Sequence, residues 1–341
     1  MSSEAAEANR RQAPVFVVGS PRSGTTLLYH MLLSAGGFAV YRSETNAFNI
    51  LETHFGPLAS VENRRRLMDS WLRSKLFRVS GLDAEQIRAR VLEPGCRNGG
   101  DFLRIVMGEV ARRQNVERWA DCTPEHALYV SRIKETIPDA LVIHIIRDGR
   151  DVALSMSRLA FPRTLPWDRE RRLVVAGLYW GWMVRHARRS GRTLGRDYLE
   201  VRFEELVSHP RETLLSLSRF IGQDLDYDRI LEVGIGSVSD PNSSFKAGGR
   251  GGGFQPVGRW REALDPAGLQ ALEDCVGGLL EALGYEPANP GEARSRRPRP
   301  LVMRAVYRMF FGSKLCLKRY TPLARLCGSK DIDRVMGPEL R

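Results

Sequence analysis

A short loop near the amino terminus, Gly19-Ser-Pro-Arg-Ser-Gly24, contains the residues of this chain best suited to chemistry. An apolar β-branched run at 15–18 precedes it, and the hydroxyl residues Thr25 and Thr26 open an apolar helix pattern after it. This order of strand, loop and helix is typical of a phosphate-binding loop, in which backbone N–H groups and the helix amino terminus face an anion. We predict that the loop binds a 5′-phosphate, and the alternative is a plain turn between strand and helix.

The same loop lacks the lysine of a Walker A sequence. Gly19 and Gly24 have the Walker separation, but Thr25 occupies the position of the lysine that holds a transferable γ-phosphoryl group. The cation lies inside the loop instead, at Arg22. A loop of this kind keeps a 5′-phosphate site while it loses the main signature of an ATP-using enzyme.

A second charged motif follows a second buried strand. The run Leu141-Val-Ile-His-Ile-Ile146 is almost continuously apolar, as expected of a strand covered on both faces of a parallel sheet. Arg147 stands where this strand ends, and Ser155 falls about two turns into the helix that follows. Ligands of parallel α/β sheets lie beyond the carboxyl ends of the strands, so Arg147 and Ser155 can bind a second phosphate beside the first. Taken alone, Arg147 and Asp148 also fit an ion pair at a helix start.

The elements that must position these motifs predict an α/β fold, namely a P-loop nucleotide-binding fold with a central parallel sheet flanked by helices. A third strand is predicted at 198–203, residues 45–118 are mainly helical, and further helices are predicted at 25–34, 129–136, 173–189 and 204–221. We assign residues 1–13 to a polar tail, 14–286 to the nucleotide-binding domain and 287–341 to a Pro/Arg-rich linker with a basic extension.

Together the two motifs resemble those of the sulfotransferases that use 3′-phosphoadenosine 5′-phosphosulfate (PAPS). The matching segments are Pro21-Arg-Ser-Gly-Thr-Thr26 and Arg147-Asp-Gly-Arg-Asp-Val-Ala-Leu-Ser155, with weaker matches at Tyr198–Leu206 with Pro210, Val257-Gly-Arg-Trp-Arg261 and Leu283-Gly-Tyr285. The resemblance covers roughly residues 14–286. Its motifs are closer to tyrosylprotein, Golgi-type and bacterial members than to cytosolic aryl sulfotransferases.

The resemblance implies a role for each motif residue. Arg22 would neutralise the charge that grows on the leaving nucleotide during an in-line displacement. Arg147 and Ser155 would hold the 3′-phosphate, which distinguishes this donor from ordinary adenine nucleotides. The 5′-phosphate would be bound by the loop residues Ser20, Pro21, Arg22, Ser23, Gly24, Thr25 and Thr26. No metal is expected, because arginine side chains supply the positive charge.

An acceptor hydroxyl needs a base to remove its proton, and Glu44 is the candidate. It lies in Tyr41-Arg-Ser-Glu-Thr-Asn46, which is similar to the catalytic Glu-Thr segment of tyrosylprotein and related Golgi-type sulfotransferases. The alternative for Glu44 is a solvated loop carboxylate. His54 and His126 are alternative bases, since cytosolic aryl and steroid sulfotransferases use histidine, but structural roles are favoured for both.

One departure from the family pattern lies at Cys122, where many relatives carry lysine before a Thr-Pro or Ser-Pro step. Either Arg250 or Arg259 replaces that lysine, or stabilisation of the transition state is weaker in this chain. The glycine-rich segment 243–261 is a candidate for closing over the adenine and 3′-phosphate, with Lys246 and Arg250 as the closing cations.

Composition limits the partners and the compartment. The chain has 341 residues and a formal net charge of +12, which favours anionic partners, but it has no recognisable nucleic-acid-binding module. Its five cysteines are dispersed, as in a reduced cytosolic protein. No secretory signal is recognisable, and no stretch approaches the roughly 18 apolar residues of a membrane span. We therefore expect a cytoplasmic protein whose oligomeric state the sequence leaves open.

The carboxyl-terminal extension allows two interpretations. Residues 301–326 mix arginine and lysine with aromatic and aliphatic residues. Such a helix either packs its apolar face on the domain or makes peripheral contact with an anionic membrane.

We predict that the chain transfers a sulfuryl group from PAPS to a hydroxyl acceptor. The acceptor class stays open among small molecules, carbohydrates, lipids and tyrosyl groups. Two alternatives are a P-loop kinase, against which Thr25 counts, and a nucleotide-binding protein without catalysis, for which Cys122 gives some support.

Overall fold

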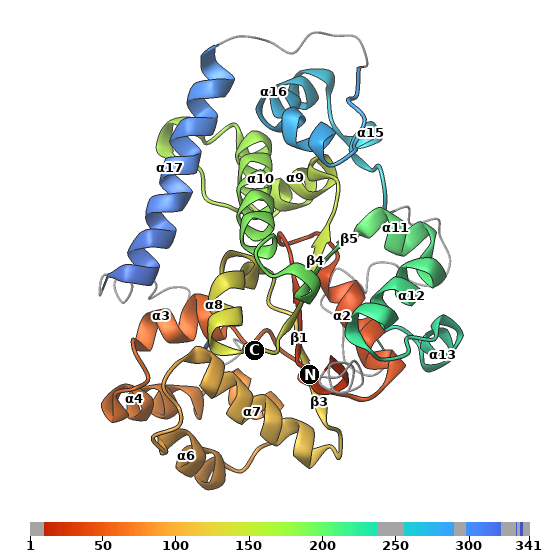
Figure 1. The fold of residues 1–341 in the computed structure, drawn as a ribbon. Helices are drawn as coiled ribbons and strands as arrows, with labels where there is room; N and C mark the ends of the chain where they lie inside the picture. The colour runs from red at the N-terminus through yellow and green to blue at the C-terminus, as the bar shows by residue number, and fades with distance from the viewer. Residues whose placement is uncertain (1–9, 237–255, 290–297, 322–331, 333–334, 337–341) are drawn as a thin grey trace.

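The computed structural model describes residues 10–236, 256–289, 298–321, 332 and 335–336. Five strands form its centre, namely β1 (Val15–Val18), β2 (Phe38–Ala39), β3 (Arg118–Asp121), β4 (Leu141–Ile146) and β5 (Tyr198–Arg202). They lie in the order β2-β3-β1-β4-β5, and every neighbouring pair is parallel. The predicted α/β fold with a central parallel sheet is confirmed (Figure 1).

The central strand β1 is buried on both faces. Phe16 and Val18 belong to one hydrophobic cluster, whereas Val15 and Val17 belong to the other, and all four side chains are fully buried. Since successive side chains of a strand point to opposite faces, each face of β1 faces its own helical layer. This double burial explains why the strand reads as a continuous apolar run.

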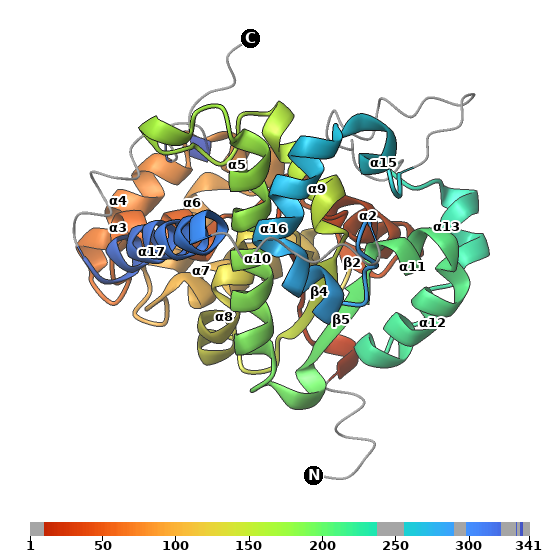
Figure 2. The ribbon, with the colours of Figure 1, turned by 90° about the horizontal axis from the view of Figure 1, so that it is seen from above.

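Helices cover both faces of the sheet (Figure 2). On the side of Phe16 lie α8 (Val130–Thr136), α9 (Gly149–Arg158), α10 (Arg172–Gly191), α16 (Pro266–Ala282) and α17 (Pro298–Tyr320). On the side of Val15 lie α2 (Thr25–Ala35), α11 (Phe203–Ser208), α12 (Pro210–Ile221) and α13 (Tyr227–Val233). The loops at the carboxyl ends of β1 and β4 therefore lie between two packed layers.

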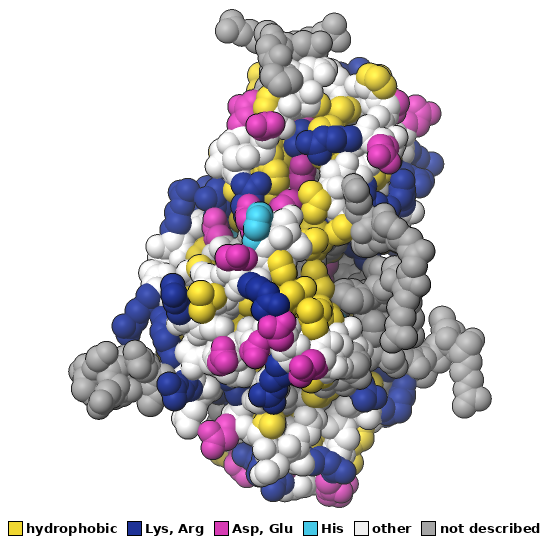
Figure 3. Space-filling view, turned by 90° about the vertical axis from the view of Figure 1, so that its right-hand side faces the viewer, with side chains coloured by type: hydrophobic (Ala, Val, Ile, Leu, Met, Phe, Trp, Pro, Cys, Tyr) yellow, Lys and Arg dark blue, Asp and Glu magenta, His cyan; other side chains and the backbone are white. Residues whose placement is uncertain are grey.

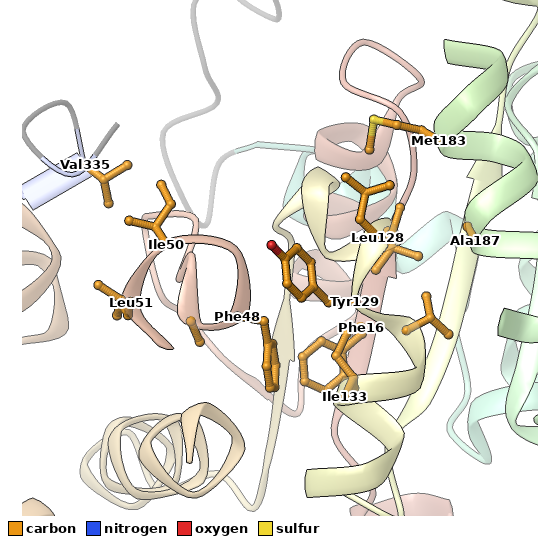
Figure 4. Close-up of a cluster of buried hydrophobic side chains, with 14 of the residues drawn as sticks. Phe16, Phe48, Ile50, Leu51, Leu128, Tyr129, Ile133, Met183, Ala187 and Val335 are labelled. Carbon is orange, nitrogen blue, oxygen red and sulfur yellow. The ribbon is translucent and has the colours of Figure 1, made fainter. Parts of the chain in front are cut away.

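The predicted helical region 45–118 begins with the π-helix η1 (Ala47–Leu51) and continues through α3 (Glu52–Phe55), α4 (Val61–Trp71), α5 (Lys75–Ser80), α6 (Ala84–Leu92) and α7 (Gly99–Arg113). Polar side chains cap the starts of α4 to α7 by accepting backbone N–H groups, which defines where each helix begins. Phe48 of η1 packs against Phe16 of β1 with ring centroids 6.4 Å apart (Figure 4). This contact anchors the region between β2 and β3 to the sheet.

Two details of the predicted secondary structure were wrong. The single helix expected at 204–221 is two helices, α11 and α12, because Pro210 lacks an N–H and begins a new helix after His209. The strands β2 and β3 were missed. Buried β3 carries the charged residues Arg118 and Asp121, so it does not read as an apolar run.

The extension beyond residue 298 forms α17, and one side of this helix is packed on the domain. Met303, Tyr307 and Phe311 are buried in the same cluster as α10 and α16. Among the helices of the described residues, none has the length and apolar character needed to cross a membrane.

Candidate nucleotide and acceptor site

The loop between β1 and α2 has an unusual backbone. Arg22 has φ = 73° and Gly24 has φ = 96°, both in the left-handed region. For a residue with a side chain this conformation is strained, and such strain concentrates at functional sites. Gly24 also has no room for a side chain, because a Cβ there would lie 2.3 Å from the ring of Phe203. The sequence of the loop is therefore matched to one tight conformation.

The two sequence motifs meet in space. The Arg22 Nε donates a hydrogen bond of 2.9 Å to the Ser155 Oγ, and Arg147 Nη1 donates one of 3.2 Å to the backbone oxygen of Arg22. The register of β1 and β4 makes this possible, because Val18 pairs with His144 and both strands end at the same edge of the sheet. The sequence-predicted residues Arg22, Arg147 and Ser155 thus lie in one site.

The charges of three arginines, Arg22, Arg147 and exposed Arg259, act on one another there. Burial, followed by the charges of Arg147 and Arg259, lowers the pKa of Arg22. Burial also lowers the pKa of Arg147, and the charge of Arg259 adds to that effect. Arg147 is further held by the ring of Phe203, whose centroid lies 4.5 Å from its Cζ atom. Like charges held this close favour the binding of an anion between them.

Two buried polar atoms of this site have no hydrogen-bond partner within the described part of the chain, the Ser23 Oγ and the Arg147 Nε. Leaving a buried polar group unpaired costs about 1–3 kcal/mol. Both atoms belong to donor groups, a hydroxyl and a guanidinium, and phosphate oxygens are acceptors that such groups can bind. The loop and the end of β4 therefore fit an anionic ligand in chemistry as well as in charge.

The charged residues after Arg147 hold a distant segment against the site. Asp151 accepts hydrogen bonds from the backbone N–H groups of Gly258 (2.9 Å) and Trp260 (3.0 Å). Asp148 accepts from the indole Nε1 of Trp260 at 3.1 Å and caps the start of α9. These contacts fix the start of α15 (Trp260–Ala263), and they carry Arg259 to the other two guanidiniums. The ion pair considered for Arg147 and Asp148 is instead one between Arg147 and Asp151, at 3.5 Å.

Buried Arg150 completes this clamp. It forms salt bridges with Asp148 at 2.8 Å and with Glu273 at 2.7 Å, and its Cζ lies 3.8 Å from the ring centroid of Trp260. Glu204 also binds the start of α9, through the N–H of Asp148 at 2.8 Å. The segments of weaker family resemblance thus meet around one helix start, which the sequence alone did not indicate.

Glu44 lies near the carboxyl end of β3, because the adjacent Thr45 bonds to Asp121, the last residue of that strand. It is exposed, and its charge acts on the thiol of Cys122, which is hydrogen-bonded to the side chain of Thr25. Burial first, then the charges of Glu44 and Asp121, raises the pKa of Cys122 well above its usual range. A thiol that stays protonated is a poor nucleophile, and Cys122 is half-buried and packs against the hydrophobic cluster on the Val15 face of the sheet.

A buried polar network fixes the backbone next to Glu44. The Thr45 Oγ1 donates to Asp121 at 2.5 Å, and the Thr123 Oγ1 accepts from the Thr45 N–H at 3.1 Å. His126 bonds Asp121 through Nδ1 at 2.7 Å and accepts the N–H of Phe48 at Nε2, so both ring nitrogens are engaged. Although burial alone raises the pKa of Asp121, the bonds from His126 and the two threonines outweigh it and lower the pKa.

The remaining predicted residues are placed as follows. Ser20, Ser23 and Thr25 are buried in the loop, Pro21 and Thr26 are half-buried, and His54 lies on α3 with its ring 4.8 Å from that of Phe55. Lys246 and Arg250 lie outside the described residues. In the described part of the chain, His, Cys, Asp and Glu side chains form no group of three that could hold a metal ion.

The sequence interpretation missed the residues that position the site, among them Thr45, Asp121, Thr123, Asp151 and Phe203. They act through contacts made by folding, so no spacing in the chain reveals them. A polar residue inside a buried strand, such as Asp121 in β3, is the one signal that was available.

Comparisons with known proteins are consistent with this geometry. The model of the Sulfotransferase family matches residues 14–227. Among solved structures, the chain is similar to the sulfotransferase domain of the Synechococcus PCC 7002 olefin synthase, at 22% identity over 80% of this chain and 95% of that one, with a TM-score of 0.54. It is also similar to the sulfotransferase domain from the curacin biosynthetic pathway, at 16% identity over 80% and 98%, with a TM-score of 0.51. No curated protein sequence matches the chain.

Proposed function

The chain belongs to the sulfotransferase family, and from this premise we propose that it transfers a sulfuryl group from PAPS to a hydroxyl of an acceptor. The observation that carries the proposal is the hydrogen bond between Arg22 and Ser155. It brings the loop proposed for the 5′-phosphate and the motif proposed for the 3′-phosphate into contact, as a nucleotide with both phosphates requires.

The donor would be held by two neighbouring sets of groups. Residues 20–26 supply backbone N–H groups, hydroxyls and the amino terminus of α2 to the 5′-phosphosulfate. Arg147 and Ser155 supply a guanidinium and a hydroxyl to the 3′-phosphate. The Ser23 Oγ and the Arg147 Nε support this assignment, since each is a buried donor for which the described residues provide no acceptor.

Arg22 is the proposed catalytic cation. During an in-line displacement the bond from sulfur to the bridging oxygen breaks, and negative charge grows on that oxygen. The Arg22 guanidinium lies within reach of the charges of Arg147 and Arg259, and we expect it to bind the oxygen more strongly as negative charge develops there. Its bond to Ser155 keeps the side chain turned toward the donor site.

Many relatives carry a lysine where this chain has Cys122, and we propose that Arg259 takes over the role of that lysine. Its charge reaches both Arg22 and Arg147, and the clamp formed by Asp148 and Asp151 positions its backbone. Lys246 and Arg250, which precede Arg259 in the chain, remain proposed as the cations that close over the adenine and the 3′-phosphate.

Glu44 is the proposed general base. It lies beside Cys122, whose thiol is hydrogen-bonded to Thr25 at the start of α2. Its side chain is exposed, so an acceptor can reach it from solvent. Its neighbours Thr45 and Asn46 are tied to Thr123, which limits the movement of the carboxylate. The proton of the acceptor hydroxyl would pass to Glu44 while the hydroxyl oxygen forms the new bond to sulfur.

The proposal is tested by calorimetric titration of the chain with adenosine 3′,5′-bisphosphate, AMP and ATP, without metal and then with Mg²⁺. We expect preference for the bisphosphate, followed by release of that product when PAPS and an acceptor library are supplied. Preference for ATP with Mg²⁺ would favour a kinase. Bisphosphate binding without turnover on any acceptor would favour the non-catalytic alternative.

A further inference from the structure

A hollow of about 380 Å³ lies between α10 and α17, and arginines line it from both helices. Arg185 and Arg189 come from α10, whereas Arg304 and Arg308 come from α17. Each pair is four residues apart, so the two guanidiniums of a pair lie one helical turn apart on the same face. Facing arginine pairs therefore surround one space, which we call the arginine pocket.

Aromatic side chains pack between α10 and α17 and fix the two helices relative to each other. The ring of Phe311 lies 5.1 Å from that of Tyr179 and 5.4 Å from that of Trp182. Tyr307 donates a hydrogen bond to Asp168 at 3.1 Å and is fully buried. Figure 1 shows α17 lying along α10, and this docking of the basic extension on the domain creates the arginine pocket between the two helices.

The residues that line the arginine pocket carry positive charge and no carboxylate. No residue that lines it is acidic, and within the described ranges none of its four arginines takes part in a salt bridge. Partial burial and the charges of Arg304 and Arg308 lower the pKa of Arg185, as expected of guanidiniums that repel one another. On the face formed by α11 to α13, in contrast, acidic and basic side chains are intermixed (Figure 3).

We propose that the arginine pocket is a second anion site, which binds phosphate monoester or pyrophosphate groups. A planar guanidinium pairs with two phosphate oxygens at once, and four of them around one hollow suit a multiply charged phosphate. The site is separate from the donor site, because none of its lining residues belongs to the loop, to α9 or to the segment around Arg259.

The rest of the lining indicates what else the ligand carries. Trp182 and Leu301 give the pocket an apolar wall beside the arginines. Leu301 and Val302 leave 59% and 58% of their surface exposed at the start of α17. A phosphate on an apolar molecule fits this combination, and it can come from the headgroup of a lipid surface or from a soluble phosphate ester.

The test uses the full chain and two charge-matched double variants. Arg304→Gln with Arg308→Gln removes two charges from the arginine pocket, while Arg299→Gln with Lys314→Gln removes two from exposed positions of the same helix outside it. Pyrophosphate is titrated by calorimetry in the presence of saturating adenosine 3′,5′-bisphosphate, which occupies the donor site. Vesicles of phosphatidylcholine with and without phosphatidic acid are tested by co-sedimentation. Thermal unfolding verifies that both variants are folded.

We expect the pocket variant to weaken binding by at least about tenfold, since two charge-assisted contacts are lost, and the control variant to change it less than about twofold. Binding of pyrophosphate alone would identify a soluble phosphate as the source, and binding of phosphatidic acid vesicles alone would identify a lipid headgroup. Equal losses of binding affinity in the two variants would overturn the proposal, because they would mean that binding depends on the net charge of the helix and not on the arginine pocket. If the chain binds neither pyrophosphate nor the phosphatidic acid vesicles, the proposal is overturned as well.

Discussion

The Arg22 Nε donates a hydrogen bond of 2.9 Å to the Ser155 Oγ, a residue 133 positions further along the chain. This contact connects the loop after β1 with the second turn of α9. Arg147 reinforces it from the end of β4 by donating to the backbone oxygen of Arg22. A cation proposed for catalysis and a hydroxyl proposed for donor recognition therefore hold each other in place.

Replacing Arg22 with alanine should abolish turnover. The proposed cation is lost where charge develops, so we expect sulfuryl transfer to fall at least about 100-fold, with little change in the thermal midpoint. Turnover is followed as release of adenosine 3′,5′-bisphosphate. Arg42→Ala, which removes an exposed arginine, is the control and should keep full activity. Normal turnover by Arg22→Ala would contradict the assignment.

Ser155→Ala should weaken recognition of the 3′-phosphate. A hydrogen bond to a charged group contributes about 1.5–3 kcal/mol, so the affinity for adenosine 3′,5′-bisphosphate should fall about tenfold or more. The affinity for AMP, which lacks the 3′-phosphate, should fall less, through the lost contact with Arg22 alone. Ser157→Ala is the matched control, because among the described residues the Ser157 Oγ bonds to the helix backbone alone, at the Leu154 oxygen. Equal losses for both nucleotides would argue against this role for Ser155.

Glu44→Gln should separate catalysis from donor binding. The amide cannot accept the acceptor proton, so turnover should fall about 100-fold to 10,000-fold while calorimetry gives an unchanged affinity for the bisphosphate. Glu62→Gln changes an exposed glutamate on α4 and should leave both properties intact. Surviving activity in Glu44→Gln would mean that another group is the base.

Asp151→Ala should loosen the segment that carries Arg259. Two backbone N–H groups, those of Gly258 and Trp260, would lose their acceptor, at a cost of about 2–4 kcal/mol in the free energy of unfolding. Because Arg259 would move away from the other guanidiniums, bisphosphate affinity should also fall. Asp151→Asn keeps one acceptor oxygen and should restore part of both. Unchanged unfolding and unchanged Trp260 fluorescence would exclude the clamp.

Stability should depend on pH through His144. Burial first, and then the charge of Arg188, lowers the pKa of this imidazole to about 3. Between about pH 6.5 and that value, the unfolded chain binds a proton that the folded one does not, so stability falls as the pH drops. From about pH 7 to pH 5 the natural chain should lose about 2 kcal/mol more than His144→Gln in urea unfolding. Parallel losses in both proteins would refute the assignment.

Local sequence was enough to predict an α/β fold with a parallel sheet, although it missed β2 and β3, and to single out the loop 19–24 and the motif after β4 as candidate ligand-binding segments. Apolar runs such as 141–146 reveal strands buried on both faces, and the loop 19–24 is recognised because its glycines and hydroxyls are neighbours in the chain. The choice of Arg22, Arg147 and Ser155 as one site depended on the rule that parallel strands end at the same edge.

Tertiary structure alone decided what surrounds those residues. Asp151 binds backbone groups more than a hundred residues away, and together with Asp148 and Arg150 it holds the segment that carries Arg259 against the site. The strand β3 and the arginine pocket were not predicted from the sequence for the same reason. A polar residue in a buried strand, or an arginine on a helix, has no special sequence neighbours, because its partners come from distant segments that meet only when the hydrophobic layers pack against the sheet.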